Sequence, residues 1–264
     1  MMRLYAVFGN PIAHSKSPLL HNAVFARFEK ELGFKASYHP LLLENPAELK
    51  QRFLELGLCG ANITTPFKEA AFHSSDKVEG LAKEIQAVNT WVLREGEIIG
   101  YNTDIEGFLA PLKGLKIVRA LVFGAGGSSR AVVCALQSRG VEVAVCNRSA
   151  DRLAYFQAQN VPSFLTKDCP SSGYDLIINT TTAGLKDDNL PYEEGLLKAL
   201  FRQAKYAYDL IYRQTPFLSL AKECGLQTFD GKAMLIAQAV LSFAQFAPKL
   251  PSPLVQETMQ AVLK

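Results

Sequence analysis

One short stretch, residues 121–130 (LVFGAGGSSR), most constrains what this chain can fold into. An apolar run typical of a buried strand ends in a cluster of glycines, and a helical pattern begins immediately afterwards. Gly124, Gly126 and Ser129 occupy the three small-residue positions of a G-x-G-x-x-small loop. Gly124 permits the tight turn, and Gly126 lets a pyrophosphate approach the backbone. The stretch predicts a dinucleotide-binding loop, and a strand–helix turn that holds no ligand is the alternative.

The residues around this loop alternate between strand and helix patterns. We expect strands at 119–123, 142–146, 175–179 and 206–210, and helices at 128–139, 150–159 and 194–201. Continuous apolar runs such as 176–178 are typical of strands buried on both faces of a parallel sheet. Right-handed crossovers then give a doubly wound sheet, in which the amides of Gly127 and Ser128 face an anion at a helix N-terminus. This part of the chain predicts a Rossmann-type domain.

More than a hundred residues precede the loop and predict a second α/β domain. We expect strands at 4–8, 35–42 and 60–64, a hairpin at 88–94 and 97–100, and helices at 18–30, 47–56, 66–72 and 105–112. Two helices close the chain, at 234–246 and 253–263, and we expect them to pack back on the first domain. The predicted division is therefore 1–104 plus 232–264 for a substrate-binding domain and 105–231 for the dinucleotide domain.

Composition limits the function classes. The 264 residues, 48% apolar, suffice for two cores, and a net charge of +3 with no basic stripe argues against nucleic acid. No apolar run approaches a membrane span, and the run before Gly9 is too short for a signal peptide. The five cysteines are dispersed without metal-ligand spacing, which favours reduced thiols in the cytoplasm and no metal. A small anionic ligand suits this chain, and monomer and homodimer stay open.

The end of the second dinucleotide-domain strand indicates which cofactor binds. An NAD-binding fold carries an acidic residue there, which bonds the ribose 2′-hydroxyl. This chain has Asn147, Arg148 and Ser149 instead, with Arg152 one helical turn further on. A guanidinium pairs with a 2′-phosphate, whereas a carboxylate repels it. The pattern predicts NADP, and a solvated Asn-Arg turn is the alternative.

Three polar clusters follow strand ends in the first domain, where open α/β sheets place ligands. They contain Ser15 and Ser17, then Asn62, Thr64 and Lys68, and finally Asn89 and Asp104. Hydroxyls, amides, one ammonium and one carboxylate suit a small polyol that carries a carboxylate. Ser17 also fits a helix N-cap, whereas Ser15 has no obvious capping role; Asn62 and Asn89 could simply form turns.

Lys68 and Asp104 are the candidates for proton transfer. We expect Lys68 about one turn inside its helix, which Thr65 would cap, and there it could donate and accept a proton. Thr103 and Glu106 have the spacing of a capping box, which would leave the Asp104 carboxylate free to accept from a ligand hydroxyl and from Lys68. A solvated lysine and an aspartate that only caps a helix are the alternatives.

The ordered motifs resemble the shikimate dehydrogenase family almost from end to end. The matching residues are 9–18 (GNPIAHSKSP), 21–22, 60–64 (GANIT) with 66 and 68, 87–90 (AVNT), 102–104 (NTD) with 107–108, 124–127 (GAGG) with 130–131, 147–148, 179–184, 208–209 with 212 and 215–216, and 231 with 234–235 and 238. The resemblance implies NADP-dependent interconversion of shikimate and 3-dehydroshikimate, a step toward chorismate and the aromatic amino acids.

By the same resemblance, individual positions acquire expected roles. Ser15 and Ser17 would hold the substrate carboxylate, and Lys68 and Asp104 would flank the hydroxyl or ketone that reacts. The other expected substrate residues are Asn62, Thr64, Asn89, Tyr212 and Gln238. The expected cofactor residues are Gly124, Ala125, Gly126, Gly127, Ser128, Asn147, Arg148, Ser149, Arg152 and Thr181, with Leu210 and Gly231 beside the nicotinamide.

Two departures from the family pattern lie near the expected nicotinamide: threonines at 180–182 replace smaller residues, and Leu185 replaces a methionine. Three alternatives accompany the resemblance. A quinate or dual quinate/shikimate dehydrogenase would share most of these residues, but the two serines favour shikimate. A non-catalytic NADP-binding regulator would not need the Lys68–Asp104 pair. A folate-type dehydrogenase would not need the polyol-binding clusters.

Overall fold

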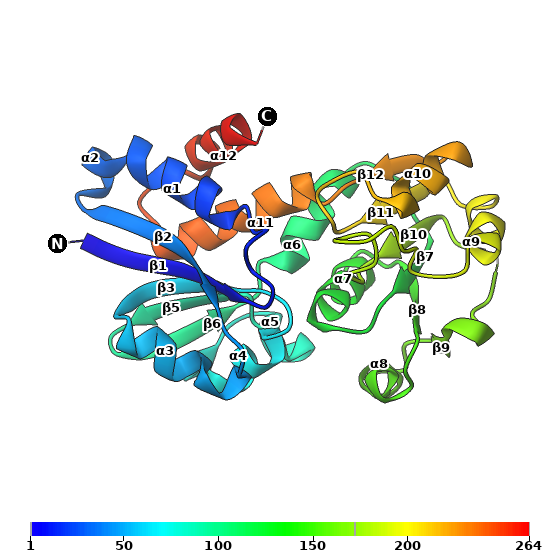
Figure 1. The fold of residues 1–264 in the computed structure, drawn as a ribbon, viewed down its shortest axis with the longest axis horizontal. Helices are drawn as coiled ribbons and strands as arrows, with labels where there is room; N and C mark the ends of the chain where they lie inside the picture. Colours follow the sequence, from blue (N-terminus) through cyan, green and yellow to red (C-terminus); the bar gives the residue numbers. More distant parts are fainter. Residues whose placement is uncertain (1, 172, 264) are drawn as a thin grey trace. The chain divides into compact units, whose positions relative to one another are not determined.

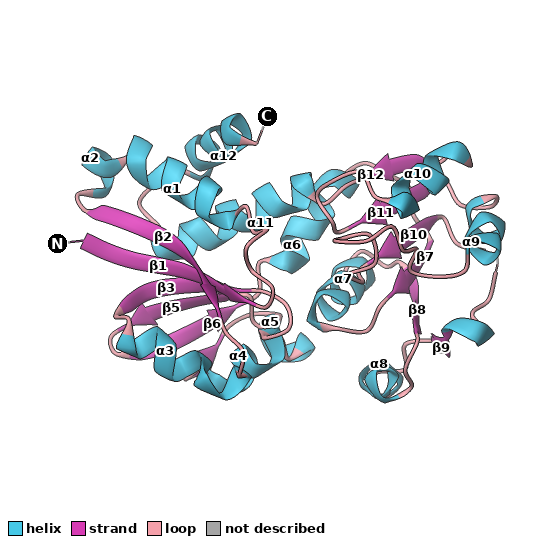
Figure 2. Ribbon diagram, viewed as in Figure 1, coloured by secondary structure: helices cyan, strands magenta, loops and turns pink. Residues whose placement is uncertain are grey.

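The computed structural model describes residues 2–171 and 173–263, and the chain forms two compact units. The first unit runs up to Gly107 and resumes at Ile236, and the second runs from Phe108 to Leu235. Each unit contains its own six-stranded sheet (Figures 1 and 2). Both boundaries fall within helices, α6 (Asp104–Leu109) and α11 (Lys232–Phe246). The domain division at 104/105 and 231/232, with the roles given to its parts, stays a prediction.

The sheet of the first unit is mixed, with strand order β2-β1-β3-β5-β6-β4. Its strands are β1 (Met2–Gly9), β2 (Lys35–Leu42), β3 (Leu58–Ile63), β4 (Lys77–Val78), β5 (Thr90–Arg94) and β6 (Glu97–Tyr101). The first three pair in parallel, and β5 runs antiparallel to both β3 and β6. The expected β5–β6 hairpin is present and places the residues after β3 beside those before β5.

Helices cover both faces of this sheet (Figures 1 and 2). They are α1 (Ser17–Arg27), α2 (Glu29–Leu32), α3 (Leu49–Glu55), α4 (Lys68–Ser74), α5 (Ala82–Ile85), the start of α6, most of α11, and α12 (Ser252–Val262), with a 3₁₀ turn at Pro46–Glu48. Helices α1 and α12 pack together on one face, whereas α3 and α4 pack on the other. The prediction that the C-terminal helices return to the first unit is confirmed, since Tyr5 of β1 contacts Phe246 of α11 at 5.0 Å between ring centroids.

The second unit is a doubly wound sheet in which every pairing is parallel, with strand order β12-β11-β10-β7-β8-β9. Its strands are β7 (Arg119–Phe123), β8 (Glu142–Asn147), β9 (Ser163–Leu165), β10 (Leu176–Asn179), β11 (Tyr206–Asp209) and β12 (Gln227–Phe229). Its helices are the end of α6, α7 (Gly127–Gln137), α8 (Ala154–Gln157), α9 (Glu194–Phe201), α10 (Pro216–Glu223) and the start of α11, with 3₁₀ turns at Ala110–Leu112, Asp151–Leu153 and Thr166–Asp168. The order reverses between β7 and β10, and such a switch point is where ligands bind in open α/β sheets.

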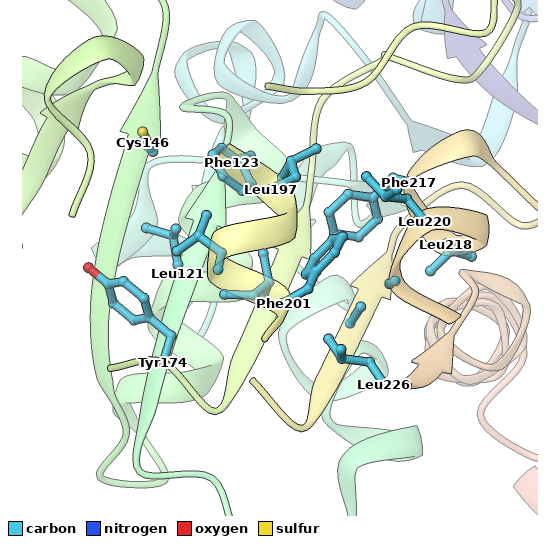
Figure 3. Packing of buried hydrophobic residues seen from close by; sticks show 14 of the residues in the cluster. Leu121, Phe123, Cys146, Tyr174, Leu197, Phe201, Phe217, Leu218, Leu220 and Leu226 are labelled. Carbon is cyan, nitrogen blue, oxygen red and sulfur yellow. The ribbon is translucent and has the colours of Figure 1, made fainter. Parts of the chain in front are cut away.

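Alternating side chains of the central strands fill two apolar layers in the second unit. Leu121 and Phe123 of β7 pack with Phe201 of α9 and Phe217 of α10 on one face (Figure 3). The residues between them face the opposite side of the strand, where α7 contacts β7 and β8. This packing holds the carboxyl end of β7, and therefore the glycine loop, in a fixed position.

Three elements of the second unit were absent from the sequence-based prediction. Strands β9 and β12 have only three residues each and pair on one side only, so their sequences show no apolar periodicity. Helix α10 begins with Pro216 after Thr215, whose hydroxyl accepts from the backbone amide of Leu218 at 3.3 Å. An N-cap threonine followed by proline is a regular helix start, so the sequence did contain the signal for α10.

Within the described residues, no helix combines the length and apolar character needed to cross a membrane. The same part of the chain contains no cluster of three or more histidine, cysteine, aspartate or glutamate residues that could hold a metal ion.

Candidate functional site

The structure brings Lys68 and Asp104 together at the start of two helices of the first unit. Lys68 Nζ donates to Asp104 Oδ2 at 2.6 Å, and the two residues are only 8% and 5% exposed. Lys68 is the first residue of α4 and Asp104 is the first residue of α6. An ion pair with this little exposure is shielded from solvent, so its charges interact strongly with each other and with any ligand beside them. The alternative of a solvated lysine is wrong.

The local expectations around this pair were wrong in their details. Lys68 is not one turn inside its helix, because residues 65–67 form a turn and Phe67 occupies the N-cap position, so Thr65 does not cap α4. The predicted capping box is also absent, because the Thr103 hydroxyl bonds Asn89 and Ser242 instead. Asn102 Oδ1 accepts from the backbone amide of Asp104 at 3.0 Å and so replaces that cap. The Asp104 carboxylate is therefore available to Lys68 for a different reason from the one expected.

Asn62 and Asn89 lie in one buried network rather than on exposed turns. Asn62 is the fifth residue of β3, and Asn89 directly precedes β5, the strand that pairs with β3. Asn62 Nδ2 donates to the backbone carbonyl of Asn89 at 3.2 Å. The interpretation that these residues only form turns is wrong, since both side chains are bonded inside the unit.

Ser15 and Thr64 occupy the loops that follow β1 and β3, and Ser17 lies where the first of these loops enters α1. Ser17 does not cap α1 but is its first helical residue, and Ser15 Oγ accepts from the backbone amide of Ser17 at 3.3 Å. Ser15 therefore has the local role that the sequence did not suggest. Thr64 donates its backbone amide to Phe8 O at 2.9 Å, and a Cβ on Gly9 would lie 2.5 Å from the Thr64 methyl. Gly9 lets the two loops approach this closely.

Gln238 and Tyr212 lie in different units. Gln238 is half-buried on α11, where a Cβ added to Gly107 would lie 2.8 Å from its own Cβ. The glycine at 107 therefore lets α6 approach α11 at the position of Gln238. Tyr212 is half-buried in the turn after β11 of the second unit.

The glycine loop has the geometry that a bound pyrophosphate requires. Gly124 has a φ of +107°, and a Cβ there would lie 2.5 Å from Thr180 Oγ1. Gly126 directly precedes α7, its amide donates to Ser129 Oγ at 3.2 Å, and Ala125 is buried between the two glycines. Among the described residues apart from its chain neighbours, only the Nη1 atom of Arg152 lies within 4.0 Å of a Cβ built at Gly126. The loop therefore leaves its backbone open beside a guanidinium, with Gly127 and Ser128 as the first residues of the helix.

The turn after β8 presents positive charge without a carboxylate at its first positions. Asn147 Nδ2 donates to the carbonyl and hydroxyl oxygens of Ser149, at 3.0 and 3.2 Å, and so closes the turn. Arg148, Ser149 and Arg152 are exposed. The expected helix over 150–159 is instead a 3₁₀ turn, Asp151–Leu153, followed by α8. These residues fit the 2′-phosphate of NADP, because two guanidinium groups are available and one adjoins the glycine loop.

Leu210 and Gly231 meet after β11 and β12. A Cβ at Gly231 would lie 2.0 Å from the carbonyl oxygen of Leu210, so only glycine fits there. Thr181, another expected cofactor residue, donates its hydroxyl to Asn179 Oδ1 at 2.7 Å.

Sequence reasoning missed two buried polar residues that organise these loops. Asp209 ends β11 and accepts from Asn179 Nδ2 at 3.0 Å, Thr215 Oγ1 at 2.7 Å and the Ile211 amide at 3.0 Å. A polar residue at the end of a buried strand was its visible signal. Ser242 of α11 joins the Asn62–Asn89 network, and no local pattern distinguishes it from other small residues of that helix.

Three comparisons with known proteins agree with this geometry. The model of the shikimate dehydrogenase substrate binding domain matches residues 7–91. The shikimate dehydrogenase (NADP(+)) of Helicobacter pylori is 51% identical over 99% of both chains. The crystal structure of shikimate dehydrogenase from Aquifex aeolicus has a TM-score of 0.80 at 36% identity and covers 97% of both chains. The enzyme from Thermus thermophilus, solved in complex with NADP(H) and shikimate, has a TM-score of 0.80 at 36% identity over 99% of this chain and all of its own.

The all-parallel second sheet, its glycine loop and the arginines beside it define a dinucleotide-binding α/β protein. The first unit adds a mixed α/β sheet with a buried lysine–aspartate pair. The chain belongs to the shikimate dehydrogenase family. The resemblance and the two-unit α/β fold predicted from the sequence are confirmed.

Proposed function

We propose that this protein catalyses the reversible NADPH-dependent reduction of 3-dehydroshikimate to shikimate. The observation that carries the proposal is the buried Lys68–Asp104 ion pair, at 2.6 Å, in a chain of this family. An ammonium and a carboxylate at hydrogen-bond distance can bind the hydroxyl or ketone between them and move one proton to or from its oxygen. The non-catalytic regulator needs no such pair, so the geometry favours an enzyme.

Each side chain has a defined part in this proposal. Lys68 Nζ gives a proton to the substrate oxygen during reduction and takes it back during oxidation. Asp104 accepts from the substrate hydroxyl and orients Lys68. Ser15 and Ser17 hold the substrate carboxylate, and Thr64, Asn89, Tyr212 and Gln238 bind its remaining polar groups.

NADP would be held by the glycine loop from Gly124 to Ser128 and by the turn containing Asn147, Arg148, Ser149 and Arg152, and when bound it supplies or accepts the hydride. Thr181, Leu210 and Gly231 would lie beside its nicotinamide.

A single assay tests the proposal. Purified protein is mixed with NADP and shikimate, and the nicotinamide absorbance is followed. NADPH should appear with shikimate, much more slowly with quinate, and more slowly when NAD replaces NADP. Faster turnover of quinate would establish the quinate dehydrogenase alternative. Binding of both ligands without any NADPH would establish the regulator.

We also propose that the protein acts in the cytoplasm, as a monomer or homodimer, without a nucleic-acid or membrane partner. The five cysteines are free thiols, which suits a reducing compartment. The net charge of +3 is small for a protein of 264 residues and does not suit a polyanion. Sedimentation at several protein concentrations would decide between monomer and homodimer.

A further inference from the structure

The first unit contains a buried network of hydroxyl and amide groups that includes two of its candidate substrate residues. The members are Asn62, Asn89, Thr90, Thr103 and Ser242, and each is no more than 6% exposed. They come from β3, the β5 strand and the residue before it, the residue before α6, and α11. Three of these segments also carry substrate candidates, namely Asn62, Asn89 and Gln238.

Three backbone groups settle the direction of the hydrogen bonds in this network. The carbonyl of Asn89 can only accept, so the nitrogen of the Asn62 amide must face it, at 3.2 Å. The amide of Thr103 can only donate, so the oxygen of the Asn89 side chain must face it, at 2.9 Å. The carbonyl of Gln238 can only accept, so the Ser242 hydroxyl hydrogen points to it, at 2.9 Å.

Ser242 can therefore only accept from the rest of the network. Asn62 Nδ2 lies 2.9 Å from Ser242 Oγ and donates to it. The Thr103 hydroxyl has two acceptors, Ser242 Oγ at 3.1 Å and Asn89 Oδ1 at 3.3 Å. We assign its hydrogen to the shorter contact, in which the serine hydrogen is already used. The two lone pairs of the serine oxygen are then filled.

The Thr103 hydroxyl completes the bonding of the Asn89 side chain, whose oxygen already faces the Thr103 backbone amide. With its own hydrogen directed to Ser242, Thr103 Oγ1 accepts from Asn89 Nδ2 at 2.9 Å. Thr90 Oγ1 donates to Asn89 Oδ1 at 2.9 Å. It also lies 3.0 Å from both Asn62 Nδ2 and Ser242 Oγ, but the hydrogens of those two groups are directed elsewhere. Among the described residues, one hydrogen of Asn89 Nδ2 has a partner and the second has none, whereas both hydrogens of Asn62 Nδ2 are used.

We propose that Ser242 is a positioning residue. It holds the Thr103 hydroxyl, which together with the Thr103 backbone amide fixes the Asn89 side chain so that a single N–H is presented to a ring hydroxyl of the substrate. In this arrangement Asn89 donates to the substrate. Asn62 directs both of its side-chain N–H groups to other members of the network and has none left to donate to the substrate. The inference rests on the proposed function, since it concerns the binding of shikimate at that same site.

Tyr38 adds a second constraint on Asn62. Its hydroxyl donates to Asn62 Oδ1 at 2.7 Å, and burial raises the pKa of Tyr38 well above its ordinary value, so the phenol keeps its hydrogen. The Asn62 amide is therefore held at both ends, and Ser242 is the network member that transmits this orientation from α11 to Thr103.

The test compares Ser242→Ala with a matched serine variant of the same unit. Ser75 also donates its hydroxyl to the carbonyl four residues earlier, Ala71 O at 2.7 Å, and accepts from a buried donor, Trp91 Nε1 at 2.8 Å, but it lies outside the network. Ser75→Ala therefore controls for the loss of stability alone. Both variants should fold, because removing one oxygen introduces no steric overlap.

The first readout is the dissociation constant for shikimate, measured by calorimetry, together with kcat and the KM for NADP. We expect Ser242→Ala to weaken shikimate binding about tenfold, because the loss of the serine oxygen leaves the buried donors that it accepted from without a partner. The KM for NADP and the shikimate affinity of Ser75→Ala should stay within twofold of wild type. A Ser242→Ala affinity within twofold of wild type would overturn the inference.

The second readout uses 4-deoxyshikimate and 5-deoxyshikimate, each of which lacks one ring hydroxyl that does not react. If Asn89 donates to one of these hydroxyls, the wild type should bind the analogue that lacks this hydroxyl about tenfold more weakly than it binds shikimate. Ser242→Ala should bind that analogue and shikimate with about equal affinity. If removing a hydroxyl weakens binding by the same factor in the wild type and in Ser242→Ala, for both analogues, then Ser242 has a purely structural role and the inference is overturned. If the wild type neither binds shikimate nor reduces NADP with it, the proposed function fails instead, which is a different result.

Discussion

The first unit builds its candidate site from side chains, whereas the second builds much of its candidate site from positions where side chains are missing. Lys68, Asp104 and Asn89 are buried and bonded to other side chains. Gly124 and Gly231 instead leave no room for a methyl group, since a Cβ would lie only 2.5 Å from Thr180 Oγ1 and 2.0 Å from the carbonyl oxygen of Leu210, respectively.

This difference predicts opposite sensitivities. The first site should suffer when atoms are removed, because a buried polar group then loses its partner. The second should suffer when atoms are added, because backbone must move to admit them. The arginines beside the glycine loop are the exception, since there the second unit uses exposed side chains.

The largest effect should come from removing the Lys68 ammonium. Lys68→Ala should lower kcat by about a hundredfold to ten-thousandfold, the usual contribution of a positioned acid–base group, with a smaller change in substrate binding. Steady-state kinetics with NADP and shikimate measure both.

Lys50→Ala is the matched control for that variant. Lys50 Nζ also pairs with an aspartate, Asp76 at 2.5 Å, but both side chains are more than a third exposed. An exposed pair contributes little, so kcat should be unchanged. Wild-type turnover in Lys68→Ala would remove the lysine from the catalytic machinery.

The next effect tests added atoms in the second unit. Gly231→Ala places a Cβ against the carbonyl oxygen of Leu210, and overpacking of this kind costs about 1–3 kcal/mol. We expect a lower melting temperature and a higher KM for NADP, with the shikimate affinity nearly unchanged.

Gly195→Ala provides the comparison, since Gly195 lies in α9 and, outside the helix's own nearby backbone, no atom of the described residues lies within 4 Å of its Cβ position. Alanine there should stabilise the helix by about 0.5–1 kcal/mol. If the two alanine variants behave alike, the second site does not depend on missing side chains.

The same contrast explains which features the sequence predicted. The bounds of β7 were predicted correctly, because a strand buried on both faces is a continuous apolar run. The roles of Ser17, Thr65 and Thr103 at helix starts were predicted wrongly, because a hydroxyl beside a helix start can bond a distant partner, as Thr103 does with Asn89 and Ser242.

Pairing between distant residues was predictable only where a motif joined them. The resemblance placed Lys68 and Asp104 at one site although 36 positions separate them. Ser242 lies 180 positions from Asn62 in an apolar helix, and only the folded chain shows that they are bonded.

A third prediction concerns the side chains that the second unit does use. Arg148→Ala and Arg152→Ala should each lower kcat/KM for NADP by about tenfold to hundredfold, because a charge-assisted bond to the 2′-phosphate is lost. The kcat/KM for NAD should change less than threefold, so selectivity falls. Arg139, exposed just beyond the far end of α7, supplies the control variant Arg139→Ala, which should leave both values unchanged. An equal loss with both cofactors would contradict the assignment of the 2′-phosphate site.

The smallest effect concerns acid and the first unit. His21 is fully buried and stacks on Tyr38 at 4.5 Å between ring centroids, and burial lowers its pKa from 6.5 to about 3. Neither ring nitrogen has a hydrogen-bond partner among the described residues. The ring therefore stays neutral in the folded unit, whereas it gains a proton in the unfolded chain below pH 6.5.

His21 should therefore make the first unit less stable as the pH falls from 6.5 toward 3, by about 1 kcal/mol between pH 6.5 and pH 5.5. His21→Phe keeps an aromatic ring in the cluster and removes the titration, so its stability should fall less over the same range. Trp91, the single tryptophan of the chain, lies in the first unit, and its fluorescence during urea unfolding reports on that unit alone. Equal losses in the wild type and His21→Phe between pH 6.5 and 5.5 would show that the His21 ring takes up its proton without unfolding, and that burial does not lower its pKa.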